Sequence, residues 1–140
     1  MLVYLDTNIW IYAYENDPTF GTPARQFMQS LRSGKHRLAG SLFVLNELLV
    51  LPTRRNDTFT IASYRQLFAS QNLDLLPYTL ASAQMYAQLR AFDRIKPMDA
   101  LHLATAAAAR VDLFITHDTK LLPLSVPGIG TIADTTFVLP

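Results

Sequence analysis

Four acidic residues stand at positions in this 140-residue sequence where a carboxylate can take part in chemistry. Asp6 directly follows the apolar run LVYL, and Asp118 comes two residues after the run LFIT. Asp99 lies just after Pro97, which opens an alanine-rich segment, and Glu47 lies inside the apolar segment SLFVLNELLVL. A carboxylate in an apolar interior needs a cation, a proton or a solvated cleft, so Glu47 requires an explanation.

Each of these acids also has an ordinary structural explanation. Asp is a favoured N-cap residue, and an acid in the first turn of a helix complements the helix dipole. Glu47 equally fits a narrow exposed stripe on a helix that is otherwise buried. The coincidence favours a functional interpretation, because ligands of open α/β sheets bind beyond the carboxyl ends of the strands. Three aspartates at strand-to-helix junctions would then meet on one rim, with Glu47 facing them.

Acids that meet on one rim repel one another unless cations hold them together. Magnesium and manganese prefer carboxylate and water oxygens, so the set predicts a Mg²⁺ site, with Mn²⁺ as an alternative, and not a zinc site. Such a site suits phosphodiester hydrolysis, because the metal activates water and stabilises charge on the phosphate and on the leaving oxygen. Thr7, Asn8 and Thr116 stand beside the acids and are candidates to orient them, although turn and cap chemistry explains each equally well.

Alternating strands and helices must position these residues. Strands are predicted at 2–5, 37–39, 73–76, 113–116 and 131–133, and helices at 8–14, 23–32, 41–51, 58–70, 79–92 and 97–110. We expect Asp6 or Thr7 to cap the first helix, Ser41 to cap the third, and Pro52 to follow the end of the third. The alternation indicates a mainly parallel sheet with helices on both faces, in one domain spanning residues 1–140.

Composition excludes several classes of protein. Half of the residues are hydrophobic and 16% are charged, which argues against disorder. No apolar run approaches the roughly 18 residues that span a bilayer, and the opening MLVYLDTNIW lacks the basic region of a signal peptide. The absence of cysteine excludes disulfides, thiolate catalysis and cysteine-based zinc sites, and it fits a cytoplasmic protein.

The basic residues give a weaker indication of what the protein binds. The net charge is only +1, but acids neutralised by bound cations would leave a positive remainder that attracts phosphates. Arg54, Arg55 and Lys120 are candidates for contacts with the phosphates of a substrate, although ordinary surface roles explain such residues as well. His102 fits packing or support of the acids better than metal binding, and His117 fits an exposed turn.

Together, LDTNIWIY (5–12), Glu47, PMDALHLATA (97–106) and FITHDTKL (114–121) resemble PIN-domain nucleases, above all the VapC-type toxins of toxin–antitoxin pairs. The resemblance covers nearly the whole chain in the family's usual order. It implies a three-layer α/β/α sandwich with a parallel five-stranded sheet of order 3-2-1-4-5. It also implies a magnesium-dependent endoribonuclease, the toxin of a type II pair, that forms homodimers and binds a cognate antitoxin protein.

The resemblance also implies roles for individual residues. Asp6 and Asp99 resemble the principal metal ligands, Asp118 completes the acidic pocket, and Glu47 is the fourth acid. Asn8 and Thr116 resemble the family's supporting polar residues, and all four acidic positions are kept in this sequence.

Two other functions remain open from the sequence. The chain could be a non-catalytic PIN-like module that binds RNA or a protein, although the intact acids argue against this. It could also be a phosphohydrolase that uses Asp6 as nucleophile, but such enzymes usually place a second aspartate two residues on, where this chain has Asn8.

Overall fold

Five short strands form one parallel sheet in the computed structural model, which describes residues 1–140. The strand order is β3-β2-β1-β4-β5 and every neighbouring pair is parallel, which confirms the predicted topology. The strands are β1 Leu2–Leu5, β2 Arg37–Gly40, β3 Asp74–Leu75, β4 Leu113–Ile115 and β5 Thr131–Ala133.

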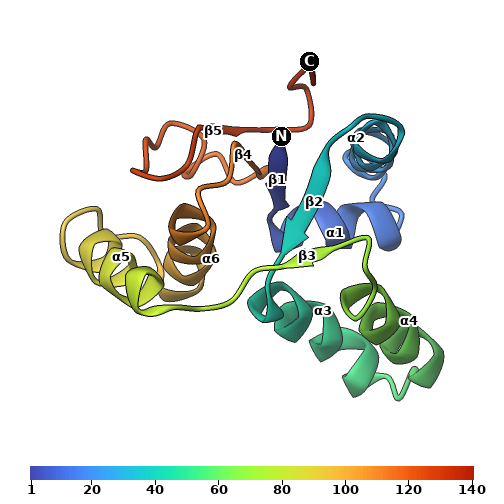
Figure 1. Cartoon of the computed structure of the whole chain (residues 1–140). Coiled ribbons are helices and arrows are strands. Elements are labelled where there is room, and N and C mark those ends of the chain that lie inside the picture. Colours follow the sequence, from blue (N-terminus) through green and yellow to red (C-terminus); the bar gives the residue numbers. More distant parts are fainter.

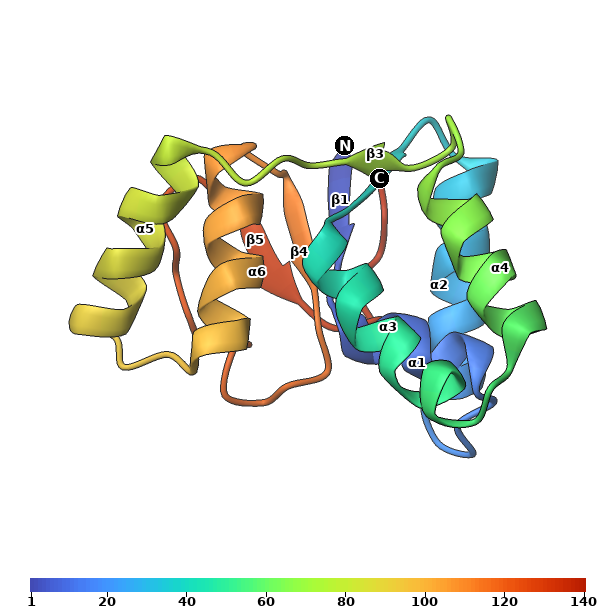
Figure 2. The same ribbon diagram turned by 90° about the horizontal axis from the view of Figure 1, so that it is seen from below.

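Six helices connect and cover these strands. They are α1 Thr7–Tyr14, α2 Gly21–Ser33, α3 Leu42–Arg54, α4 Thr58–Phe68, α5 Leu80–Ala91 and α6 Pro97–Ala108. Figures 1 and 2 both place α5 and α6 side by side, apart from α1, α2 and α4, so helices lie on both faces of the sheet as predicted. The helix α3 contacts both α1 and α6, so it lies where the two groups of helices meet. None of the helices combines the length and apolarity that crossing a bilayer requires.

The centre of the sheet creates the position for a site. The strands β2 and β3 lie on one side of β1, whereas β4 and β5 lie on its other side. The order therefore reverses between β1 and β4, and open α/β sheets bind ligands beyond the carboxyl ends of the strands at such a point. The backbone N–H of Asp6 donates to the Ile115 carbonyl at 2.9 Å, which ties the two strand ends together.

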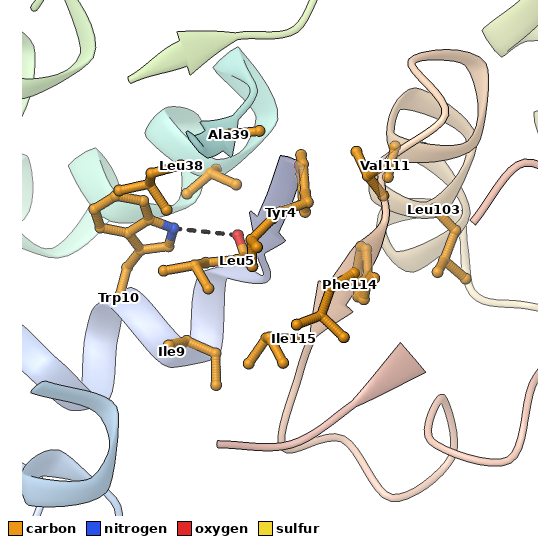
Figure 3. Close-up of a cluster of buried hydrophobic side chains, with 14 of the residues drawn as sticks. Tyr4, Leu5, Ile9, Trp10, Leu38, Ala39, Leu103, Val111, Phe114 and Ile115 are labelled. Carbon is orange, nitrogen blue, oxygen red and sulfur yellow. Dashed lines mark hydrogen bonds between the residues drawn. The ribbon is translucent and has the colours of Figure 1, made fainter. Parts of the chain in front are cut away.

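Buried apolar side chains fix the two central strands in place (Figure 3). The rings of Tyr4 and Phe114 stack across β1 and β4 with centroids 5.2 Å apart. Trp10 on α1 is fully buried, and its indole N–H donates to the Leu5 carbonyl at 3.1 Å (Figure 3). This bond and the surrounding packing hold α1 directly beneath the end of β1, so the position of Asp6 between them is fixed by the core.

The main departure from the predicted elements is in α3, which does not end before Pro52. It continues to Arg54, and Pro52 is buried within its last turns. A proline inside a helix removes its own N–H bond and crowds the carbonyl four residues earlier, but here the next turn still closes through the Arg55 N–H to the Leu51 carbonyl at 3.1 Å. Nor is α3 as buried as its composition indicates, because Leu42 and Val50 are each 56% exposed.

The other helices differ from prediction mainly at their ends. The helix predicted at 23–32 begins earlier, at Gly21, and the helix predicted at 97–110 ends earlier, at Ala108. Arg110 takes a left-handed φ of 54°, which no α-helix accommodates. Asp6 caps α1 as expected, accepting from the Thr7 N–H. Ser41 stands at the N-cap position of α3 but makes no side-chain capping bond, because its hydroxyl contacts Tyr4 instead.

Candidate active site

Asp6 lies directly after β1, beside the end of β4, and is only 6% exposed. One carboxylate oxygen accepts from the Thr7 N–H at 2.8 Å. The other accepts from the Thr116 hydroxyl at 2.7 Å and from the Asn8 amide at 3.1 Å. Burial raises the pKa of Asp6, although the nearby His102 and the hydrogen bonds from Thr116 and Thr7 favour its charged form.

Asn8 and Thr116 connect Asp6 to the loop that follows β4. The Asn8 amide also donates to the Thr116 hydroxyl at 3.1 Å, and its carbonyl oxygen accepts from the His117 N–H at 3.2 Å. The Thr116 hydroxyl in turn accepts from the Asp118 N–H at 3.0 Å. The structure therefore brings Asp118 to the same rim as Asp6. Two of the three predicted supporting residues, Asn8 and Thr116, lie between them.

Glu47 reaches the same rim from α3. Its Oε2 accepts from the Thr7 hydroxyl and from Nε2 of His102, the latter at 2.8 Å. Burial alone would raise the pKa of Glu47, but the hydrogen bonds from His102 and Thr7 outweigh it and lower that pKa. Oε1 makes no hydrogen bond within the chain. The apolar segment tolerates this glutamate because His102 and Thr7 donate to one of its oxygens while the side chain stays 34% exposed.

A buried hydrogen-bonded chain lies behind Glu47. Nδ1 of His102 contacts the Tyr4 hydroxyl at 2.8 Å, and the Tyr4 hydroxyl contacts the Ser41 hydroxyl at 2.7 Å. All three side chains are almost completely buried, so each needs the others as partners. The sequence does not indicate that Tyr4 and Ser41 belong to a hydrogen-bonded chain behind the acids. The available signal was a tyrosine in a buried strand, because the hydroxyl of such a residue usually has a partner.

Asp99 and Asp118 are held much less firmly. The Asp99 carboxylate, in the first turn of α6, accepts no hydrogen bond, and Asp118 accepts only one, from the Lys120 N–H at 2.9 Å. Burial raises the pKa of Asp99, and the charges of Asp6 and Asp118 raise it further, partly offset by His102 and Lys96. Asp99 therefore lies close enough to Asp6 and to Asp118 to be repelled by each of them.

The oxygen donors of the rim decide whether it fits the divalent cation that the sequence predicts. No group of three or more acidic or histidine side chains is drawn together tightly enough to hold an ion by itself. Magnesium needs less than that, because it usually takes one or two carboxylates and keeps several waters. Asp99 and Oε1 of Glu47 offer free hard oxygens, and the Asp6 oxygen that accepts only the Thr7 N–H keeps a lone pair for an ion. Both nitrogens of His102 are already hydrogen-bonded. This donor set fits Mg²⁺ or Mn²⁺.

The predicted RNA-contacting cations remain without acidic partners. Arg54 and Arg55 lie at the exposed end of α3, and Lys120 is exposed beside Asp118. The only ion pair of an arginine or lysine with an acid is Arg37 with Asp74. Contact between these cations and RNA therefore stays a prediction.

Comparison with known proteins identifies the family. Residues 3–124 match the family model described as PIN domain. VapBC2 from Rickettsia felis, solved bound to a DNA fragment from its promoter, is 21% identical with a TM-score of 0.74, covering 96% of this chain and 98% of that one. VapBC-1 from nontypeable Haemophilus influenzae is 21% identical with a TM-score of 0.70, covering 98% of this chain and 100% of that one.

VapC20 from Mycobacterium tuberculosis, described as a Sarcin-Ricin loop cleaving toxin, is 17% identical with a TM-score of 0.67, covering 88% of this chain and 96% of that one. No curated protein matches the chain. At such identities the solved structures establish the fold alone, whereas the family model spans most of the sequence. The chain therefore belongs to the PIN-domain family.

Proposed function

We propose that this protein is an endoribonuclease that hydrolyses RNA phosphodiester bonds with Mg²⁺ or Mn²⁺, acting as the toxin of a type II toxin–antitoxin pair. One observation carries the proposal. Asp99 lies near Asp6 and Asp118 at the reversal point of a parallel sheet, where burial and then the charges of those two aspartates raise its pKa, and Glu47 reaches the same rim with one free oxygen. This is a site with excess negative charge, and a divalent cation would relieve it.

Asp6 and Asp99 would hold the ion, with Asp118 and Glu47 completing the acidic rim. When bound, the ion would supply an activated water and stabilise charge on the phosphodiester. Thr116 and Asn8 keep the Asp6 carboxylate in one orientation through their hydrogen bonds. His102 holds Oε2 of Glu47 in the same way, so Oε1 is left for water or substrate.

The neighbouring structures support RNA as substrate and an antitoxin as partner. One is described as cleaving the Sarcin-Ricin loop, and several others are toxin–antitoxin complexes. The chain also exposes large apolar side chains on α3 to α5 and the connections beside them, which suits a protein that buries surface against an antitoxin or a second copy. They are Leu42, Val50, Phe59, Leu80 and Phe92. We propose a homodimer that binds its antitoxin in the cytoplasm.

The competing functions are less well supported by the geometry. A phosphohydrolase with Asp6 as nucleophile needs a general acid near position 8, but the Asn8 amide donates to Asp6 and cannot supply an acidic proton. A purely binding module gives no reason for three aspartates that repel one another on one rim.

The test is cleavage of single-stranded RNA. The wild-type protein is expected to cut RNA with Mg²⁺ or Mn²⁺ and to stop when EDTA is added. We expect Asp99→Asn to lower the rate by roughly 100-fold or more. It removes a carboxylate ligand of the ion, and that ion would stabilise transition-state charge by several kcal/mol. Asp93→Asn is the matched control, since Asp93 is exposed and makes no hydrogen bond.

Two results would refute the proposal. One is full activity of Asp99→Asn, and the other is cleavage that persists in EDTA. If the wild-type protein cuts no RNA but binds a protein partner without metal, the binding-module function is the correct one.

A further inference from the structure

A cluster of three rings lies beside the acidic rim and has no role in holding the acids. Tyr12 on α1, Phe20 at the start of α2 and His117 after β4 pack together. The His117 ring lies 4.5 Å from that of Phe20 and 5.8 Å from that of Tyr12, centroid to centroid. The Tyr12 and Phe20 centroids are 5.1 Å apart. Three segments that are distant in the sequence thus meet in one small aromatic group.

The backbone connects this aromatic cluster to the site. The His117 N–H donates to Asn8, whose amide donates to Asp6, and His117 is the residue directly before Asp118. His117 is therefore one residue away from Asp118 and two hydrogen bonds away from Asp6. We therefore expect a substrate whose phosphate lies among those carboxylates to place an adjacent nucleotide near the cluster.

The cluster is held in place before any ligand binds. Nε2 of His117 lies 2.9 Å from the Thr135 hydroxyl, which fixes the orientation of the imidazole. Asp17 accepts from the N–H groups of Thr19 and Phe20, at 2.9 and 2.7 Å, which fixes the turn that carries Phe20. Thr135 lies outside residues 3–124 that match the family model, so this clamp on His117 comes from the chain's own C-terminal segment.

Phe20 is not simply part of the core, because 37% of its surface is exposed and it stands outside the buried set. Another exposed aromatic residue, Tyr14 on α1, gives a useful contrast with Phe20. Tyr14 is 45% exposed but faces a different direction, stacking on Trp10 and contacting Tyr64 on α4. The same helix therefore presents one tyrosine to α4 and another, Tyr12, to the loop that carries Asp118.

We propose that Tyr12, Phe20 and His117 form a stacking subsite for a nucleobase next to the scissile phosphate of a single-stranded RNA; this rests on the proposed ribonuclease function. Acidic side chains repel the substrate's phosphates, so contacts that do not depend on charge would add binding energy close to the acids. A base has an uncharged aromatic face, and stacking on protein aromatics tolerates any base. Phe20 is the ring with the most exposed surface of the three.

The experiment measures RNA binding in the Asp99→Asn background, in which cleavage is expected to be negligible. A fluorescein-labelled single-stranded RNA of mixed sequence is titrated with protein and followed by fluorescence anisotropy. Phe20→Leu is expected to weaken binding about tenfold, within the range for loss of one stacked base. Phe20→Tyr keeps an aromatic face and is expected to bind normally. Tyr14→Leu, the matched control on the opposite side of α1, is also expected to bind normally.

A second measurement separates stacking from a structural effect. Abasic nucleotides are placed one at a time along a defined RNA. At one position, loss of the base is expected to weaken binding about tenfold when Phe20 is present and to have no further effect in Phe20→Leu. This coupling requires contact between the ring and a base, and a loss of protein stability does not produce it.

The outcomes separate this inference from the proposed function. Unchanged binding in Phe20→Leu, equal weakening in Tyr14→Leu, or independent effects of the abasic position and the variant would overturn the subsite while leaving the nuclease intact. If Phe20→Leu does not fold, the abasic scan with Phe20 and Phe20→Tyr decides, and the absence of any sensitive position overturns the subsite. A coupled position in a wild-type protein that cleaves no RNA would support the subsite and refute the nuclease.

Discussion

The acidic rim has two halves that are built differently. Asp6 and Glu47 are held by hydrogen bonds from neighbouring side chains, and both lie at the end of chains of buried polar groups. Asp99 accepts no hydrogen bond, and Asp118 accepts only one from a nearby backbone N–H. One half is therefore positioned in advance, and the other half is free to adjust.

This difference shows how stability and proposed function are divided between the acids. The held acids are part of the polar interior, so changing their partners affects folding. The unheld acids contribute repulsion and free oxygens, so changing them affects ion binding while leaving the fold intact or improving it. The following variants test this division.

His102→Phe is expected to have the largest effect on stability. It leaves Oε2 of Glu47 and the Tyr4 hydroxyl with one partner fewer in a buried region, which costs about 1.5–3 kcal/mol of unfolding free energy. Denaturant unfolding without metal measures it. His36→Phe is the control, since His36 is only partly buried and has a weak contact at 3.5 Å, and it is expected to change stability by less than about 0.5 kcal/mol. Equal effects of the two substitutions would contradict the claim that His102 and its partners hold Glu47 in place.

The pH dependence is expected to have opposite signs in the two halves. The pKa of Asp99 is raised above its ordinary 3.8, so its ionisation costs stability as pH rises through that raised value. The pKa of Glu47 is lowered below its ordinary 4.5, so its charge contributes stability that is present above pH 4.5 and lost as pH falls through the lowered value.

Unfolding free energies measured against pH without metal check this prediction. Asp99→Asn is expected to be more stable than wild type at neutral pH, with the advantage shrinking as pH falls toward 3.8. Glu47→Gln is expected to be less stable, with its deficit shrinking below pH 4.5. Two curves of the same sign would show that the acids are not divided in this way.

Asp118→Asn is expected to have the smallest effect on folding. Asp118 is half-buried, and its one hydrogen bond is to the exposed Lys120 N–H, so we expect a change within about 0.5 kcal/mol. Thermal unfolding of the metal-free protein measures this. A loss comparable to that of His102→Phe would place Asp118 in the held half.

The sequence was sufficient for the order of the sheet and for the strand ends that Asp6 and Asp118 follow. Apolar runs ended by Asp6 and by Thr116 follow from local periodicity, and the reversal of strand order follows from the family resemblance. The end of α3 was not predictable, because Pro52 is a strong local signal that tertiary burial overrides. The contact between Tyr4, His102 and Ser41 joins residues 37 and 98 positions apart, and no local pattern encodes such a contact.

The central claim is that the acids of the two halves together bind a divalent cation. Isothermal titration of the folded wild-type protein with Mn²⁺ tests this directly, with Asp99→Asn and the exposed Asp93→Asn measured alongside. We predict saturable binding to wild type and Asp93→Asn that weakens at least tenfold in Asp99→Asn. Absence of binding to the wild type, or equal affinity in all three proteins, would contradict the account.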